Sequence, residues 1–185
     1  MRYLIKNQTT KIDSSQCRIE PMEFEDLKEV LKIEKSAFLS PWNGKLFIKA
    51  LGDPKRDIFL LKKIECAITS VVIGYVCIRR GNNQAHILQF ATTPFYRGQG
   101  FGLTLLHFTL AYLVEENLRK VFLEVREYNQ PAFLLYKQFG FQQIGTIPHY
   151  YPDTGEGAFM MERDLSVYVS TRSQHKDYRR MLYEK

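Results

Sequence analysis

The chain has 185 residues, which at about 150 residues per domain corresponds to a single domain with room for a short extension. Hydrophobic residues make up 45% of it and charged residues 25%, a composition that excludes a disordered, collagen-like or low-complexity protein. A total of 26 basic against 20 acidic side chains gives a net charge of +6, which favours acidic partners without identifying them.

The first half of the chain predicts a short strand, two helices separated by a turn, and a meander of three strands. The strands show stretches rich in β-branched residues, and the helices show apolar residues at helical spacing. These elements are expected at residues 17–20, 23–38, 45–51, 58–66, 70–79 and 85–92.

The second half predicts alternating helices and strands, at residues 100–116, 121–125, 130–139, 141–147 and 158–162. A loop from Pro148 to Gly157 joins the last two strands in this interpretation. A meander followed by such an alternation predicts an α/β fold with a mixed sheet. Residues 1–16 are interpreted as an N-terminal extension, residues 17–165 as the folded domain, and residues 166–185 as a basic C-terminal tail.

Signals for export, membrane insertion and metal binding are missing from the sequence. No apolar run approaches the roughly 20 residues of a membrane span, and residues 1–16 lack the hydrophobic region of a signal peptide. The three cysteines form no C-x-x-C pair, and the four histidines are scattered without metal-ligand spacing. We therefore expect a cytoplasmic protein with no metal ion and no membrane association.

A glycine-rich turn between a strand and a helix is the most informative stretch, Arg97-Gly98-Gln99-Gly100-Phe101-Gly102. Glycines let backbone amides approach a ligand closely, and the first amides of a helix attract phosphate. The spacing fits neither the P-loop nor the dinucleotide-binding fingerprint. The alternative is a tight turn with no ligand.

A second group of polar residues follows at Glu124, Asn129 and Tyr136. Strand alternation places Glu124 on the face opposite Leu123 and Val125. A carboxylate inside an apolar strand is costly unless it is paired or functional, although an edge strand facing solvent would also explain it. Asn129 and Tyr136 share one helix face, where a helix cap and a core tyrosine are the alternative.

Together these motifs resemble the GNAT acetyltransferases, and in particular their RimI branch, the N-terminal protein acetyltransferases. R-x-x-G-x-G is matched from Arg97 to Gly102, and E-V-R-x-x-N-x-x-A-x-x-L-Y-x-x-x-G-F from Glu124 to Phe141. I-E-x-x-A-F-x-x-P-W is matched from Ile33 to Trp42, and a tyrosine pair stands at Tyr150-Tyr151. The resemblance implies a GNAT fold, with a mostly antiparallel mixed sheet flanked by helices.

The resemblance also implies a role for each matched residue. Glu124 would be the general base, acting through water, and Tyr136 the general acid that protonates the departing thiolate. Acetyl-CoA would bind to Phe90, Ala91, Thr92, Arg97, Gly98, Gln99, Gly100, Phe101, Gly102 and Asn129. The peptide groove would be walled by Phe38, Trp42, Tyr150 and Tyr151.

Two positions depart from the family pattern. The family often has Glu-Asp before the last strand, where this chain has Glu156-Gly157, and this leaves the substrate open. Some members carry a base on the strand before the glycine turn, where this chain offers only Gln89. More weight therefore falls on Glu124.

An N-terminal α-amine is the expected acceptor. Its pKa near 8 leaves roughly a tenth of it neutral at pH 7, while lysine, with a pKa near 10.4, is almost fully charged. Direct attack needs no covalent intermediate, and Cys66 and Cys77 are expected to be core residues. Acetylation of lysine or a small amine remains open, as does a non-catalytic acetyl-CoA-binding or ribosome-associated module. The basic tail suggests the ribosome as a further partner.

Overall fold

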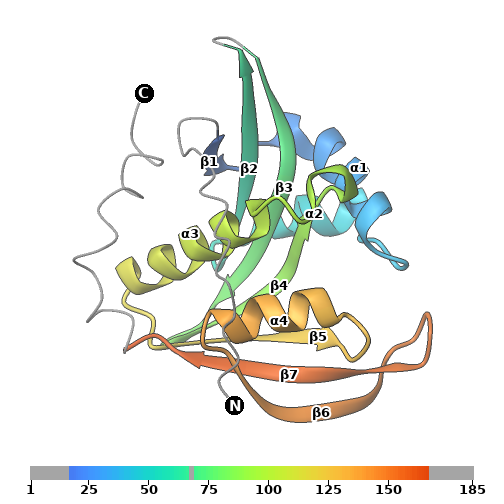
Figure 1. Ribbon diagram of the computed structural model, residues 1–185. Coiled ribbons are helices and arrows are strands. Elements are labelled where there is room, and N and C mark those ends of the chain that lie inside the picture. Colours follow the sequence, from blue (N-terminus) through green and yellow to red (C-terminus); the bar gives the residue numbers. More distant parts are fainter. Residues whose placement is uncertain (1–16, 67–68, 167–185) are drawn as a thin grey trace, which may run out of the picture.

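The computed structural model describes residues 17–66 and 69–166 (Figure 1). The expected N-terminal extension and the tail from residue 167 onward lie outside the described residues. None of the helices in the described part of the chain has the length and apolar character needed to cross a membrane.

The described residues form a seven-stranded sheet in the order β1-β2-β3-β4-β5-β7-β6. Every neighbouring pair is antiparallel except β4 and β5, which are parallel. The expected mixed, mostly antiparallel sheet is therefore confirmed. The strands are β1 (Cys17–Pro21), β2 (Arg56–Cys66), β3 (Thr69–Arg80), β4 (Gln84–Thr92), β5 (Lys120–Arg126), β6 (Gln142–Tyr151) and β7 (Glu156–Asp164).

Helices cover both faces of the sheet (Figure 1). The helices are α1 (Leu27–Ala37), α2 (Gly44–Leu51), α3 (Phe101–Glu115) and α4 (Gln130–Gln138), with short 3-10 turns η2 (Phe24–Asp26) and η3 (Pro94–Tyr96). Residues of α3 and α4 share one core with alternate strand residues such as Leu61 and Leu123. Residues of α1 and α2 share a second core with Leu60 and Tyr75 on the other face.

The sheet divides in its middle, between β4 and β5. Their pairing runs only from Gln84 opposite Lys120 to His86 opposite Phe122, although both strands continue. Beyond these residues β4 pairs with β3, and β5 pairs with β7. Figure 1 shows the two strands diverging from their shared end. We refer to this divergence as the split.

A bulge in β4 accompanies the split. Cys77 of β3 lies opposite Gln89, whereas its neighbour Ile78 lies opposite Ile87, so Leu88 is an extra residue in β4. Such a bulge reverses the alternation of side chains beyond it. Ile87 therefore packs into the core under α3, while Ala91 packs into the core under α1 and α2.

Three sequence expectations need correction. The predicted loop from Pro148 to Gly157 is too long, because β6 continues to Tyr151 and β7 begins at Glu156. This continuation needs an irregular register and a positive φ of 53° at His149, which period-two patterning does not indicate. The first helix starts later than predicted. Residues Phe24–Asp26 form the 3-10 turn η2, whose N-terminus is capped by a capping box between Glu23 and Asp26. Cys77 is buried as expected, but Cys66 is exposed at a strand end.

Candidate active site

The glycine turn joins the end of β4 to the start of α3. Gly98 and Gly100 have φ values of +72° and +89°, the left-handed region that other residues adopt only with strain. The first bond within α3 runs from the Thr104 N–H to the Gly100 carbonyl, over 3.1 Å. The preceding amides of the helix therefore have no carbonyl partner inside it, an arrangement that suits phosphate.

Side chains fasten this turn to its surroundings. The Arg97 Nε donates a hydrogen bond to the Thr92 carbonyl at 3.3 Å, which ties the turn to the end of β4. The Gln99 side chain donates to the Phe95 carbonyl at 2.9 Å. Arg97 is exposed, so its charge lies beside the turn where an anion would be held.

The split places an unpaired strand edge next to the turn. Phe90 and Ala91 of β4 pair with Val76 and Tyr75 of β3, and the described pairing with β5 has already ended at His86. The β4 edge that faces the split therefore presents backbone groups with no strand partner. An extended ligand with amide groups could hydrogen-bond along it.

Glu124 and His86 meet where the split begins, because His86 is in the last pair that joins β4 to β5. The Glu124 Oε2 and His86 Nε2 lie 2.6 Å apart, although the residues are 38 positions apart in sequence. The His86 ring stacks on Phe122 with centroids 4.5 Å apart, and both polar side chains are about 15% exposed. Because β5 is an inner strand and Glu124 is paired, the solvent-facing alternative for this residue is excluded.

Tyr136 belongs to α4, and its side chain packs in the core on the sheet face opposite Glu124. Its side chain is 6% exposed, and its ring lies 6.1 Å from that of Phe90 and 5.5 Å from that of Phe141. Burial raises the pKa of Tyr136 well above its usual value, so the phenol stays protonated at neutral pH. Asn129 caps α4, since its side-chain oxygen accepts a hydrogen bond from the Ala132 N–H at 3.3 Å.

Tyr150 and Tyr151 stand beside Glu124 at the end of β6. Their ring centroids lie 5.0 Å apart in an edge-to-face arrangement. Burial raises the pKa of Tyr151 to about 12, and the negative charge of Glu124 adds to the rise in both tyrosines. Tyr151 in turn contributes to the raised pKa of Tyr136. The tyrosine pair therefore lies within electrostatic range of Glu124, and Tyr151 lies within electrostatic range of Tyr136.

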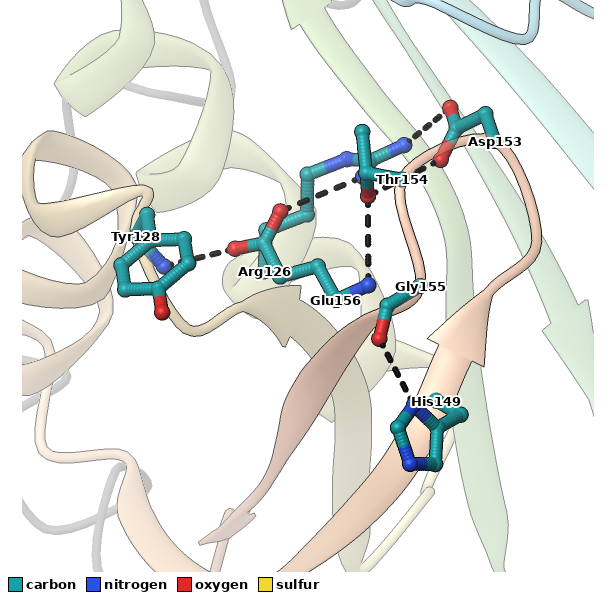
Figure 2. A network of polar contacts seen from close by, with 7 residues as sticks. All are labelled: Arg126, Tyr128, His149, Asp153, Thr154, Gly155 and Glu156. Atoms are coloured by element: carbon teal, nitrogen blue, oxygen red, sulfur yellow. Dashed lines mark hydrogen bonds and ion pairs between the residues drawn. The ribbon is translucent and has the colours of Figure 1, made fainter.

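Arg126 holds the hairpin that carries these tyrosines (Figure 2). Its guanidinium binds Asp153 at 2.5 Å, Thr154 at 3.0 Å and Glu156 at 3.3 Å. The same guanidinium lies 3.8 Å above the Tyr151 ring. Arg126 thus fixes Tyr151 through one cation–π contact and three polar contacts to the adjoining turn.

The α1–α2 segment contacts the tip of that hairpin. A hydrogen bond from Ser40 and the ion pair with Arg126 both lower the pKa of Asp153, the ion pair more strongly. Phe38 and Trp42, which flank Ser40, pack partly buried on the core under α1 and α2. The two predicted walls of the acceptor groove, the α1–α2 segment and the β6–β7 hairpin, are therefore brought together by the fold.

Comparison with protein families gives a match to the model of the Acetyltransferase (GNAT) family over residues 26–141, more than half of the chain. The chain belongs to the acetyltransferase (GNAT) family. The expected GNAT fold and the expected enzyme class, an acetyl-CoA-dependent N-acetyltransferase, are thereby confirmed.

Individual GNAT proteins are similar to the chain over most of its length. A Bacillus subtilis protein, provisionally named a ribosomal protein bS18-alanine N-acetyltransferase, is 37% identical over 76% of this chain and 90% of its own. The crystal structure of the ribosomal-protein-S18-alanine N-acetyltransferase from Escherichia coli has a TM-score of 0.71 and 26% identity, over 80% of this chain and 94% of that one. Spermidine/spermine N-acetyltransferase SpeG from Vibrio cholerae has a TM-score of 0.71 at 23% identity, over 85% and 98%, and shares the fold alone.

The residues around the split fit the acetyl-CoA of this GNAT family. The positive-φ glycines and helix amides suit its pyrophosphate, and the unpaired β4 edge suits the amides of its pantetheine arm. Within residues 17–66 and 69–166, His, Cys, Asp and Glu side chains nowhere gather in a group of three that could hold a metal ion.

The structure adds two residues to the predicted site, His86 and Arg126. In the sequence His86 is one of four scattered histidines, and Arg126 lies inside a matched motif that implies no role for it. Gln89, the β4 side chain that the family pattern points to, is not the partner of Glu124. For His86 the signal was available, because the predicted strand 85–92 places it near the start of β4, but only the parallel register brings it to Glu124.

Proposed function

We propose that this enzyme transfers the acetyl group of acetyl-CoA to the N-terminal α-amine of a protein, in the manner of the RimI branch. The observation that carries the proposal is the Glu124 carboxylate, held by His86 in the split beside the Tyr150–Tyr151 pair. Similarity to two bS18-alanine N-acetyltransferases supports a ribosomal protein as the acceptor.

Glu124 acts as the general base through a water molecule. An α-amine needs to lose only one proton of modest acidity before it attacks, so a carboxylate that acts through water suffices. His86 fixes the carboxylate by the 2.6 Å contact and is itself fixed by stacking on Phe122. The neutral amine then attacks the thioester carbonyl, a C–N bond forms, and the C–S bond breaks.

Tyr136 acts as the general acid for the departing thiolate. Its raised pKa keeps the phenol protonated, and its position between Phe90 and Phe141 keeps it next to the β4 edge. The proton passes from the phenol oxygen to the sulfur. The proton that Glu124 removes before the attack leaves through water to solvent, and the second proton, which nitrogen loses as the amide forms, offsets the one that Tyr136 gives up.

The donor is held mainly by backbone. Amides from Gly98 to Gly102 bind the pyrophosphate, and Arg97 adds a positive charge at the edge of the turn. The backbone of Phe90, Ala91 and Thr92 binds the pantetheine arm. The side-chain oxygen of Asn129 is used by the helix cap, so its amide N–H₂ is the group that contacts coenzyme A.

The acceptor peptide lies between Phe38 and Trp42 on one side and Tyr150 and Tyr151 on the other. The catalytic domain spans residues 17–165, and the basic residues 166–185 hold the enzyme near ribosomal RNA.

Release of coenzyme A thiol tests the acceptor with three substrates. These are a peptide with a free N-terminal alanine, the same peptide with a blocked N-terminus and an internal lysine, and spermidine. The proposal expects turnover with the first substrate and at least 100-fold lower kcat/KM with the other two. Preference for the lysine peptide or for spermidine would reject the N-terminal assignment while leaving acetyl transfer intact.

A further inference from the structure

A buried carboxyl group lies beneath the α1–α2 segment and takes no part in the chemistry described above. Glu34, in the last turns of α1, is 0% exposed. Neither of its carboxyl oxygens makes a hydrogen bond of full geometry in the described part of the chain, and nor does the hydroxyl of Tyr75 beside it. A buried carboxyl without full pairing is costly, so its presence calls for a role.

Glu34 lies next to both ends of the segment from Phe38 to Trp42, through its backbone at one end and its side chain at the other. Its backbone carbonyl accepts a hydrogen bond from the Phe38 N–H at 3.0 Å, where α1 ends. Its side chain faces the backbone N–H of Trp42 and the Tyr75 hydroxyl, which as donors both favour the ionised carboxylate. The main-chain bond fixes the end of α1 at Phe38, and the carboxyl group faces Trp42, so the Glu34 side chain acts on the Trp42 end of the segment that walls the proposed groove.

The same residue connects the segment to the donor strand. Tyr75 of β3 is fully buried and lies opposite Ala91, in the part of β4 proposed to bind acetyl-CoA. Phe47 of α2 packs edge-on between the Tyr75 and Trp42 rings, with centroids 5.6 Å and 5.5 Å away. A continuous row of packed rings, Tyr75, Phe47 and Trp42, thus connects the residues next to β4 with the proposed acceptor groove.

We propose that Glu34 is a positioning residue for the acceptor: its buried carboxylate holds the Phe38–Trp42 segment in the shape that binds the peptide. The inference rests on the proposed function, because that function makes this segment an acceptor wall. Glu34 contacts neither reacting group, so it sets acceptor affinity and leaves the chemical step unchanged.

The geometry makes this control sensitive to pH. Burial raises the pKa of Glu34 to about 7, against the opposing donors Tyr75 and Trp42. Two titratable groups of β3 face it: burial raises the pKa of Tyr75 far above its usual value and that of Cys77 to about 12, so both stay neutral. From α2 the same core receives the apolar Phe47 and Ala50. Glu34 alone among these groups changes its charge near neutrality, and acceptor KM rises as the pH falls below 7.

Kinetics with an N-terminal peptide give the first test. Glu34→Leu should raise acceptor KM about tenfold, an effect of the size of one polar contact to a charged group, with kcat and the KM for acetyl-CoA within twofold of wild type. Glu29→Gln removes a carboxylate from the exposed side of the same helix and should change none of the three values. A folded Glu34→Leu variant with unchanged acceptor KM would overturn the proposal.

Tryptophan fluorescence gives a second test that needs no turnover. Trp42 is the single tryptophan of the chain, so its emission reports on the segment directly. The wild type should show a transition near pH 7, which Glu34→Gln abolishes and Tyr75→Phe moves to higher pH, because Tyr75 favours the ionised carboxylate. Both variants preserve side-chain size, so this test stands if Glu34→Leu does not fold.

The two tests separate this inference from the proposed function. If the wild type acetylates no peptide N-terminus but Glu34→Gln removes the fluorescence transition, the function falls and the role of Glu34 in holding Trp42 stands. If Glu34→Gln keeps the wild-type transition, the positioning role falls whatever the acceptor proves to be.

Discussion

The donor side of the split presents backbone groups, whereas the acceptor side presents side chains drawn from three separate segments. On the donor side the turn at Gly98–Gly102 and the edge of β4 follow each other directly in the chain. On the acceptor side Trp42, Glu124, Arg126 and Tyr151 converge from α1–α2, β5 and β6. Binding on the donor side therefore depends on local backbone conformation. Activity on the acceptor side depends on contacts between residues that are distant in sequence.

The largest expected effect comes from the acceptor side. Glu124→Gln preserves shape but removes the base, and should lower kcat by about 10²- to 10⁴-fold. Calorimetry should find acetyl-CoA affinity within twofold of wild type, because the donor is held by backbone elsewhere. A rate within threefold of wild type from pH 6 to 9 would assign the base to another residue.

The free energy of unfolding should depend on pH through Glu34. Its pKa is about 7 in the folded protein and 4.5 when free, so the folded state binds the extra proton between these values. Stability is therefore lost as the pH rises from about 4.5 to 7, by up to about 3 kcal/mol. Urea unfolding should find Glu34→Gln more stable than wild type at pH 8 by up to that amount, and nearly equal at pH 4.5. The same difference at both pH values would contradict the shift.

A substitution that disturbs the backbone conformation of the glycine turn should weaken donor binding. Gly100→Val forces a branched residue into a φ of +89°, at a cost of about 1–3 kcal/mol, and obstructs the approach of phosphate. Acetyl-CoA affinity should fall at least tenfold by calorimetry. Gly145→Val is the matched control, because a Cβ there meets nothing within 4 Å. Equal acetyl-CoA affinity in the two variants would reject this turn as the phosphate-binding site.

His86 should show a smaller, indirect effect. His86→Phe preserves the stacking on Phe122 and removes the contact with Glu124, so kcat should fall about fivefold to tenfold. The pH–rate profile should shift together with kcat if His86 acts through Glu124. An unchanged profile with an unchanged kcat would make the histidine a packing residue.

The smallest effect is expected from the tail. Deletion of residues 166–185 should leave acetylation of a short peptide within twofold of wild type, because the matched motifs all precede it. Co-sedimentation with ribosomes at low salt should weaken, since phosphate contacts are strongly salt-dependent. Equal co-sedimentation with and without the tail would reject the ribosomal arm.

The contrast between the two sides also explains what sequence could predict. The sequence pattern of Gly98, Gly100 and Gly102 indicates a local backbone conformation. Glu124 can be recognised because it is a charged residue in an apolar strand. His86 could not be assigned in the same way, because its contact depends on a parallel register across 38 residues. The end of the hairpin is also hard to predict, because Pro148 and His149 are typical of loops, yet β6 passes through them and brings the Tyr151 ring against Arg126.

The three residue pairs that join β4 to β5 also have a consequence for amide hydrogen exchange. Amides on the facing edges of the split have no strand partner, so in the free protein they are open to solvent while their neighbours in β3 and β7 are protected. A donor lying along the β4 edge would supply the missing acceptors. The binding of acetyl-CoA would then be recorded as slowed exchange at the alternate amides that face the split, those of Phe90 and Thr92, without any acceptor being known.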